Sequence, residues 1–274
     1  TIAQFATTAP LNPNYREEEF VFYLEDLNAK AVVVNKDYEG PAALAAQRLN
    51  IQIIRLVESK VIAGLFSLEA EKKSNVIEDE VVNENDVALI LHTSGTTSRP
   101  KIVPLLQSNI AASASNIAQS LSLSSSDRCM SVMPLFHIHG LIAAVSASLT
   151  AGASIWCSSG FNALSFFSNL DEAKPTWYTA VPTMHQAILA RAGRNAETIE
   201  NNPLRFLRSS SASLPAQVMG ELVESFGAPV VEAYGMTEAT HQMCCNRLDK
   251  QKPGSVGIPA GPSVKIAHEV DDCL

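Results

Sequence analysis

Short apolar runs alternate with segments of helical periodicity along most of the chain, and this alternation constrains the fold more than any other feature. The runs that predict strands are 31–34, 51–54, 87–91, 128–134, 153–157, 177–181, 204–209 and 230–233. The segments that predict helices are 17–27, 41–49, 108–121, 141–149, 162–172, 183–191 and 215–226. Strands joined by helices form a mostly parallel sheet covered on both faces. The predicted fold class is therefore α/β, with ligands expected at the carboxyl ends of the strands.

Residues with strong local preferences predict where three of these helices begin or end. Asn14 is expected to cap the helix that starts at Glu17, and Ser108 is expected to cap the helix after the stretch ending at Lys101. Gly227 is expected to end the helix 215–226. The acidic, polar segment 69–86 is expected to be a surface loop.

Composition limits the classes of partner. The chain has 274 residues, 46% of them apolar and 18% charged, which indicates a globular core. The net charge of −8 argues against a nucleic-acid partner. Five cysteines without metal-ligand spacing indicate reduced thiols in an intracellular protein, either cytoplasmic or peroxisomal. The charge-free segment between Arg128 and Asp171 is interrupted by proline and glycine, so it predicts a buried core rather than a membrane span. Both termini look like cuts through a longer chain.

The stretch LHTSGTTSRPK, Leu91–Lys101, follows a predicted strand and is the first candidate site. Its hydroxyls and turn N–H groups suit phosphate oxygens, Gly95 permits close approach of the backbone, and Lys101 supplies a mobile positive charge. The P-loop pattern is absent because no second glycine precedes the lysine, which disfavours a P-loop kinase or NTPase. A polar turn between two strands explains the same residues equally well.

The stretch VVEAYGMTEATHQM, Val230–Met243, is the second candidate site. It leaves a predicted strand at the edge of the sheet where ligands are expected. Glu238 is a candidate Mg²⁺ ligand and Thr237 a candidate phosphate donor. The alternative is an ordinary helix start with Thr237 as its cap.

Two further stretches supply polar side chains. PLFHIHGL, Pro134–Leu141, places His137 and His139 on the same side of an extended segment, but no third metal ligand is evident, and lining a pocket or capping a helix is the favoured role. RSSSASLP, Arg208–Pro215, is a serine-rich turn after a strand, suited either to a ligand or to helix capping by Ser211 or Ser213. The absence of G-x-S-x-G leaves a serine hydrolase without support.

In this order and spacing the four stretches resemble the adenylate-forming superfamily, which contains acyl-CoA synthetases, luciferases and peptide-synthetase adenylation domains. TSGTTSRPK is similar to its phosphate loop and EAYGMTE to its second signature, while PLFHIHG and SSSASLP match positions between them. PLNPNYREEEFVFYLEDLNAKAVVV and KPGSVGIP extend the resemblance over nearly the whole chain. HTSGTTSRPK, TWYTAVPTMHQ, RSSSASL and EAYGMTEATHQM are most similar to the oxalate–CoA ligase group of plants and fungi.

The resemblance implies a reaction in two steps. A carboxylate attacks the α-phosphate of ATP, giving an acyl-adenylate and pyrophosphate, and the thiol of coenzyme A then displaces AMP. Mg²⁺ is the implied metal, held by Glu238, and Thr237 would contact the α-phosphate. His137, Ser211 and His241 would line the acid pocket. The residues implied to bind the β- and γ-phosphates are Thr93, Ser94, Gly95, Thr96, Thr97 and Lys101. Those implied to line the adenine pocket are Ser211, Ala212, Ser213, Glu232, Ala233 and Tyr234, followed by Gly235 and Met236.

The sequence also departs from the family pattern. Ile102 replaces the usual glycine after the loop lysine, which would be strained if that position needs a positive φ. The ribose-binding Asp, the hinge and the small C-terminal domain with its catalytic lysine are not present. Residues 1–274 are therefore expected to be the central part of the AMP-binding N-terminal domain, truncated at both ends, which alone would adenylate poorly. The alternative is a truncated, non-catalytic member that keeps the fold and weak nucleotide binding.

Overall fold

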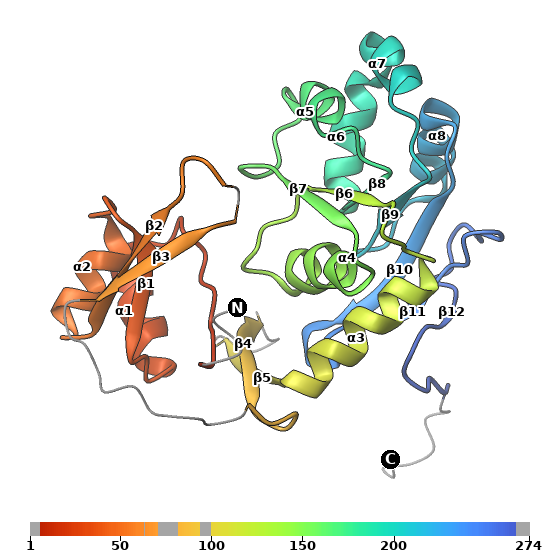
Figure 1. The fold of residues 1–274 in the computed structure, drawn as a ribbon. Helices are drawn as coiled ribbons and strands as arrows, with labels where there is room; N and C mark the ends of the chain where they lie inside the picture. The colour runs from red at the N-terminus through yellow and green to blue at the C-terminus, as the bar shows by residue number, and fades with distance from the viewer. Residues whose placement is uncertain (1–5, 63, 71–81, 94–99, 267–274) are drawn as a thin grey trace. The chain divides into compact units, whose positions relative to one another are not determined.

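The computed structural model describes residues 6–62, 64–70, 82–93 and 100–266 (Figure 1). The chain divides into two compact units: Leu11–Val82 form the smaller unit, and Thr1–Pro10 together with Asn83–Leu274 form the larger unit. All candidate site residues belong to the larger unit.

The smaller unit is a three-stranded sheet with two helices. Its elements are α1 (Glu17–Asp26), β1 (Ala31–Asn35), α2 (Pro41–Arg48), β2 (Gln52–Glu58) and β3 (Phe66–Ala70). The strand order is β1-β2-β3; β1 and β2 are parallel, whereas β3 is antiparallel to β2. Its core joins one face of each helix through Phe20, Val21, Leu24, Ala42 and Ala45.

The larger unit is built on a seven-stranded sheet with the order β12-β11-β10-β9-β8-β6-β7. The strands are β6 (Arg128–Ser131), β7 (Ser154–Cys157), β8 (Trp177–Ala180), β9 (Phe206–Ser209), β10 (Val230–Met236), β11 (His241–Cys245) and β12 (Ile258–Pro259). The five strands from β7 to β10 are parallel, and β11 and β12 add to the β10 edge in antiparallel fashion. A mostly parallel sheet was the prediction from the sequence, and it is confirmed.

Helices cover both faces of this sheet, as Figure 1 shows. One face packs against α3 (Gln107–Ser120), the π-helix η2 (His139–Ser146) and α4 (Ala147–Thr150). The other packs against α5 (Phe166–Ala173), α6 (Pro182–Ala192), α7 (Ala196–Asn201) and α8 (Ala216–Phe226), with the short 3-10 turn η3 (Gly193–Asn195) after α6. Successive strand residues alternate between the two cores: Trp177 and Phe206 face the first, Tyr178 and Leu207 the second.

A separate antiparallel hairpin joins β4 (Val87–Thr93) to β5 (Lys101–Leu106). The structure contains more elements than the sequence predicted. β3, β11, β12 and α7 were not predicted. The segment 69–86 predicted as a loop begins inside β3, and its residues 71–81 lie outside the described residues. Two predicted helix caps are wrong. α1 is preceded by Arg16, whose N–H donates to Glu19 Oε2 at 2.9 Å, and α3 is preceded by Leu106, whose N–H donates to Asn109 Oδ1 at 3.0 Å. Neither Asn14 nor Ser108 occupies the capping position.

The helix predicted at 141–149 begins two residues earlier and starts as a π-helix. Gly140 in its first turn lies so close to the preceding loop that a Cβ would sit 2.4 Å from the Pro134 carbonyl oxygen. Only glycine fits this approach.

Within the described residues, none of the helices combines the length and apolarity that crossing a membrane requires. Cys129, Cys157, Cys244 and Cys245 are free thiols, as expected.

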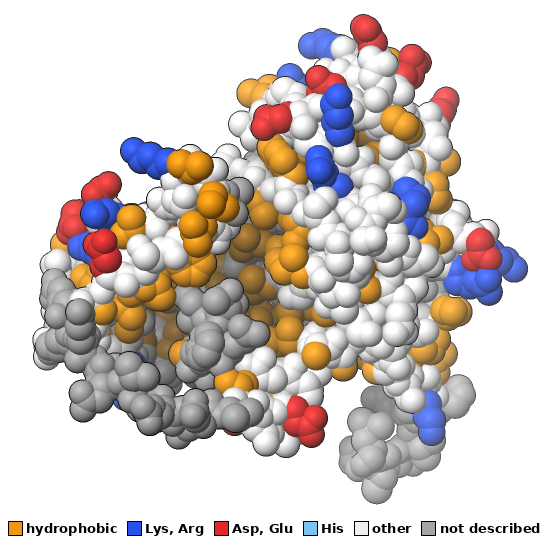
Figure 2. Space-filling view, in the orientation of Figure 1, with side chains coloured by type: hydrophobic (Ala, Val, Ile, Leu, Met, Phe, Trp, Pro, Cys, Tyr) orange, Lys and Arg blue, Asp and Glu red, His pale blue; other side chains and the backbone are white. Residues whose placement is uncertain are grey.

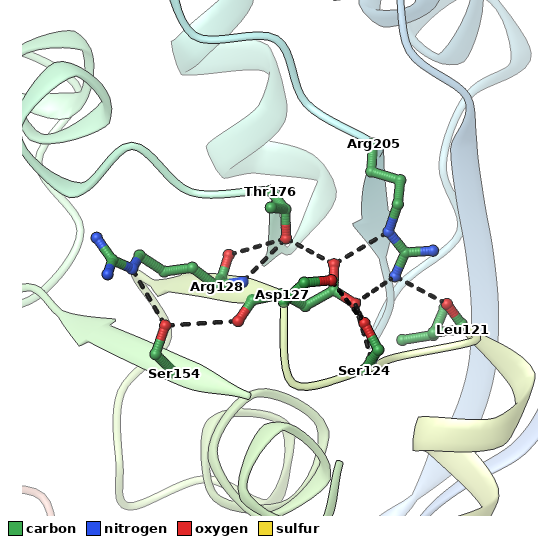
Figure 3. Close-up of polar contacts among 8 residues, drawn as sticks. Leu121, Ser124, Asp127, Arg128, Ser154, Thr176 and Arg205 are labelled. Carbon is green, nitrogen blue, oxygen red and sulfur yellow. Dashed lines mark hydrogen bonds and ion pairs between the residues drawn. The ribbon is translucent and has the colours of Figure 1, made fainter. Parts of the chain in front are cut away.

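Where the strands begin, a charged network ties three of them together, which we call the amino-edge network (Figure 3). Asp127, which precedes β6, accepts two hydrogen bonds from Arg205, one from Nε to Oδ1 and one from a terminal nitrogen to Oδ2, both 3.0 Å long. Its Oδ1 also accepts from the Thr176 hydroxyl at 2.7 Å, and its Oδ2 from the Ser124 N–H at 2.9 Å. Burial alone would raise the pKa of Asp127, but these hydrogen bonds and the Arg205 charge hold it below its ordinary value.

Candidate active site

The hairpin brings together the two ends of the predicted phosphate loop. Thr93 ends β4 and Lys101 begins β5, and the two residues are directly paired across the hairpin. Lys101 is exposed, and the buried Thr93 hydroxyl has no hydrogen-bond partner among the described residues. Ser94, Gly95, Thr96 and Thr97 lie outside the described residues. Ile102 lies in extended strand β5 opposite His92 and has no positive φ, so the strain considered for this position is absent.

The turn between β10 and β11 carries the second predicted stretch. Gly235 is so close to the returning strand that a Cβ would lie 1.3 Å from the His241 carbonyl oxygen, and the β10–β11 register shifts at this point. Thr237 and Glu238 form a single 3-10 turn, η4 (Thr237–Ala239), and not the start of an α-helix. Glu238 is exposed and Thr237 is half-buried. The turn therefore presents both side chains at the carboxyl end of β10, with Tyr234 and Met236 exposed beside them.

The serine-rich loop lies against the end of β10. The Ser210 hydroxyl donates to the Ala233 carbonyl at 2.9 Å, and the Leu214 N–H donates to Glu232 Oε1 at 3.0 Å. Glu232 is 3% exposed, and its Oε2 has no partner among the described residues. The predicted caps Ser211 and Ser213 do not cap α8, which is preceded by Pro215. Ser211, Ala212 and Ser213 are exposed, so the loop offers a reachable surface.

The two histidines of PLFHIHGL do not share a side, contrary to prediction. They lie in a turn that enters η2, where the backbone is not extended, so His137 is exposed and His139 is buried. His139 instead stacks on His241, with ring centroids 5.0 Å apart. The family resemblance implies an acid-pocket role for His241 and none for His139.

The most unusual group of the site is Arg208, in β9, whose side chain is completely buried. One terminal nitrogen donates to His139 Nε2 at 3.2 Å and to Thr179 Oγ1 at 3.3 Å. The other donates to His241 Nε2 and to Gln242 Oε1, both at 3.1 Å. These five side chains are called the carboxyl-edge cluster below. Figure 2 shows Lys and Arg side chains on the surface of one face of the molecule. Arg208, in contrast, has no exposed part.

Every partner of the Arg208 guanidinium is uncharged. The described residues supply no carboxylate to it, and its Nε–H is buried without an acceptor among them. Burial lowers the pKa of Arg208 to about 10, which still leaves it protonated at neutral pH. Burial, reinforced by Arg208, holds the pKa values of His139 and His241 well below their ordinary range, so neither ring adds charge. An isolated buried charge is costly unless it is paired, and this one is therefore suited to an anion.

The comparisons with known proteins identify the scaffold. The model of the AMP-binding enzyme family matches residues 2–272. The chain belongs to that family. It is 46% identical to the oxalate–CoA ligase of Arabidopsis thaliana over 96% of this chain and 52% of that protein. It is 38% identical to the oxalate–CoA ligase of Saccharomyces cerevisiae over 97% of this chain and 53% of that protein.

A solved structure supports the same fold. The ternary product complex of malonyl-CoA ligase with methylmalonyl-CoA and AMP superposes with a TM-score of 0.74 at 28% identity, covering 91% of this chain and 51% of that chain. The chain thus spans about half the length of the relatives it matches. It carries the adenylate-forming fold of these enzymes' N-terminal domains.

The carboxyl-edge cluster adds residues that the motifs did not single out. Arg208 opened one of the quoted stretches, yet no site role was predicted for it, for Thr179 or for Gln242. His139 was considered only together with His137, for lining a pocket or capping a helix. A signal was present, because Arg208 stands two residues after Phe206 and therefore on the same face of β9 as a core residue.

Proposed function

We propose that this chain is the nucleotide-binding core of an ATP-dependent acid–CoA ligase whose acid is oxalate. The family membership and the names of the most similar relatives support the ligase chemistry. They do not favour the non-catalytic alternative. The observation that carries the choice of acid is the buried Arg208, whose positive charge meets no carboxylate among the described residues.

A dicarboxylate accounts for that unmatched charge. One carboxylate of oxalate is activated, and the other remains ionised and needs a cation in a site that excludes water. Arg208 supplies the cation, with His139, His241 and Thr179 around it as neutral hydrogen-bonding groups. A monocarboxylic acid such as acetate has no second charge to offer, and an acid–arginine pair buried from water is worth far more than one at the surface.

The nucleotide is proposed to lie along the carboxyl ends of β9 and β10. Thr93 and Lys101 hold the β- and γ-phosphates together with Ser94–Thr97, and Thr237 contacts the α-phosphate. Ser211–Ser213 and Glu232–Tyr234 border adenine, where the unpartnered Glu232 Oε2 and Ser209 hydroxyl leave hydrogen-bonding capacity. The carboxylate of the acid attacks the α-phosphate, pyrophosphate leaves, and the coenzyme A thiol then displaces AMP.

Mg²⁺ fits this arrangement through Glu238. Mg²⁺ is commonly held by one or two carboxylates together with substrate phosphates rather than by a complete protein cage. An exposed carboxylate next to the predicted phosphate contact Thr237 meets that requirement. When bound, the ion neutralises charge on the phosphates; the protein groups Lys101 and Thr237 orient them for in-line attack.

The test is acid-dependent ATP–pyrophosphate exchange on the full-length protein, with oxalate, malonate, acetate and a medium-chain fatty acid compared side by side. Exchange with oxalate alone is the expected result. Exchange only with another acid would keep the ligase and reject oxalate. No exchange with any acid, from well-folded protein, would reject the ligase itself.

A further inference from the structure

His139 connects two parts of the site that have different predicted ligands. Its Nε2 lies 2.6 Å from Thr179 Oγ1 and 3.2 Å from a terminal nitrogen of Arg208, in the carboxyl-edge cluster. Its Nδ1 lies 3.0 Å from the Ser211 hydroxyl, in the serine-rich loop beside β10. The ring is 1% exposed and stands at the first residue of η2. A single buried ring therefore contacts both the proposed acid pocket and the proposed nucleotide loop.

The contact with Arg208 fixes where the proton of the ring lies. A guanidinium can only donate, so Nε2 of His139 must accept and cannot carry a hydrogen. The neutral ring then carries its hydrogen on Nδ1 and donates it to Ser211 Oγ. The hydroxyl of Thr179 donates to Nε2 in the same arrangement. The charge of Arg208 thus determines which atom of His139 faces Ser211 as a donor.

The backbone of Ser211 needs such a restraint. Its φ is +74°, a left-handed conformation that is uncommon and unfavourable for any residue except glycine. Ser211 is also exposed, so packing does not hold it. The ring of His139 is held by its contacts with Thr179 and Arg208 and by its stacking on His241. A fixed ring thus donates to a strained, exposed loop residue.

We propose that His139 is a positioning residue that couples occupancy of the acid pocket to the shape of the nucleotide loop. A carboxylate that binds Arg208 shifts the guanidinium or restricts its motion. The guanidinium in turn holds the His139 ring through Nε2, and the ring holds Ser211 through Nδ1–H. Acid and nucleotide then bind more tightly together than separately, by an equal factor in each direction. The coupling to oxalate rests on the function proposed above.

Two substitutions separate the two sides of the ring. In H139N, the side-chain amide reaches the position of Nδ1 and can still donate to Ser211, but it falls short of Arg208. In H139Q, the amide oxygen reaches the position of Nε2 and can still accept from Arg208, but no donor faces Ser211. H185N is the matched control. His185 is an equally buried histidine that contacts the Tyr178 hydroxyl and the Arg208 carbonyl oxygen, but neither the guanidinium nor Ser211.

The measurement is calorimetric titration of the full-length protein with oxalate and with an ATP analogue carrying an α,β-methylene bridge, each alone and in the presence of the other. Wild-type protein is expected to bind the analogue about tenfold more tightly when oxalate is present. H139Q should weaken the analogue about tenfold and leave oxalate within about threefold, and H139N should show the reverse. Both should reduce the coupling to about twofold or less, while H185N lowers thermal stability and keeps the wild-type factor.

The results that would overturn the inference are specific. If H139N and H139Q weaken both ligands together, as a merely structural change in the core would, His139 does not position either one selectively. Wild-type coupling in both variants would also reject it. If wild-type protein binds the analogue but no oxalate, the proposed function fails instead, and the affinity of H139Q for the analogue alone still decides whether His139 holds the nucleotide loop.

Discussion

Two threonine–arginine pairs lie on or just before β8 and β9, and the second pair lies three residues after the first along both strands. Only the first pair has a carboxylate beside it among the described residues. Thr176 and Arg205 lie just before β8 and β9, while Thr179 and Arg208 lie inside the same two strands, directly paired in register. The first pair surrounds the carboxylate of Asp127. The second pair is surrounded by neutral histidines and an amide, with no carboxylate among the described residues.

This difference indicates that Arg205 stabilises the fold, whereas the charge of Arg208 remains unpaired among the described residues. Arg205 makes a bidentate contact with a buried carboxylate, although its own side chain is 37% exposed and already partly solvated. Arg208 has neither solvent nor a counter-charge. A buried charge of this kind does not improve stability relative to an apolar side chain, so its presence calls for another explanation. Binding a substrate carboxylate is the explanation that we propose.

The largest expected effect comes from removing the unmatched cation. R208M should lower oxalate-dependent ATP–pyrophosphate exchange at least about 100-fold, because a buried carboxylate that loses its arginine loses a strong charge-assisted contact. Its free energy of unfolding should be unchanged or higher, because an apolar side chain replaces an uncompensated charge. Exchange assays combined with urea unfolding measure both. A fall in stability with exchange preserved would reverse the roles assigned to the two arginines.

The buried histidines and the amino-edge network should also affect the free energy of unfolding in different pH ranges. Burial holds the pKa values of His139 and His241 well below the ordinary value and lowers that of His185 to about 4. As pH falls through about 6.5, the unfolded chain takes up protons at these residues and the folded protein does not, so stability decreases. From pH 7 to 5.5 the loss should reach about 1 kcal/mol for each histidine, or about 3 kcal/mol together.

The amino-edge network should respond only in more acidic solution. The pKa of Asp127 is held below its ordinary value, so the stability it contributes is complete above about pH 4 and is lost as pH falls further. Urea unfolding between pH 7 and 5.5 tests the histidine contribution, to which His137 adds because burial lowers its pKa too. H185N should reduce the slope by at most about a third. A flat profile in this window would mean that the rings take up protons as readily in the folded protein as in the unfolded chain.

Breaking the paired arginine should cost stability rather than activity. R205M leaves the buried carboxylate of Asp127 without its cation and should lower the free energy of unfolding by about 2 kcal/mol, less than for a fully buried pair because Arg205 is partly exposed. Exchange activity per folded molecule should stay within about twofold. A large loss of exchange at full stability would place Arg205 in the reaction.

The smallest effect is expected from the threonines. T176V removes one hydrogen bond to Asp127 and should cost about 1 kcal/mol of stability without changing exchange. T179V removes a partner of both Arg208 and His139 and should instead raise the KM for oxalate several-fold. Equal effects of the two substitutions on the KM for oxalate would show that the amino-edge network and the carboxyl-edge cluster are not functionally distinct.

The sequence allowed the parallel sheet to be predicted because its apolar runs are short and separated by helical periodicity. The helix end at Gly227 was predicted because glycine commonly ends helices, and Gly227 indeed has the αL conformation, with φ +61°. β3 was missed although Phe66, Leu68 and Ala70 alternate with polar residues, and every one of its residues is exposed. β12 was missed because it has only two residues, both exposed. β11 was missed because it pairs across a turn whose close approach depends on Gly235.

The candidate site was predictable only in part. The motifs located Lys101, Thr237, Glu238 and the serine-rich loop, and the loop and β10 do lie together. The separation of His139 from His137 was missed because local spacing was interpreted for an extended segment, whereas the chain turns into a π-helix there. The convergence of Arg208 on His139 and His241 joins residues 69 and 33 positions away, and such contacts depend on the register of the sheet.

The most direct measurement compares oxalate with oxamate, its monoamide, in exchange assays of wild-type protein, R208M and R205M. Oxamate keeps one carboxylate for activation and replaces the other with a neutral amide. The wild-type protein and R205M should prefer oxalate by at least about 30-fold in kcat/KM, and R208M should show a preference close to 1. The same preference in R208M as in the wild-type protein would contradict the account, because Arg208 would then not bind the second carboxylate.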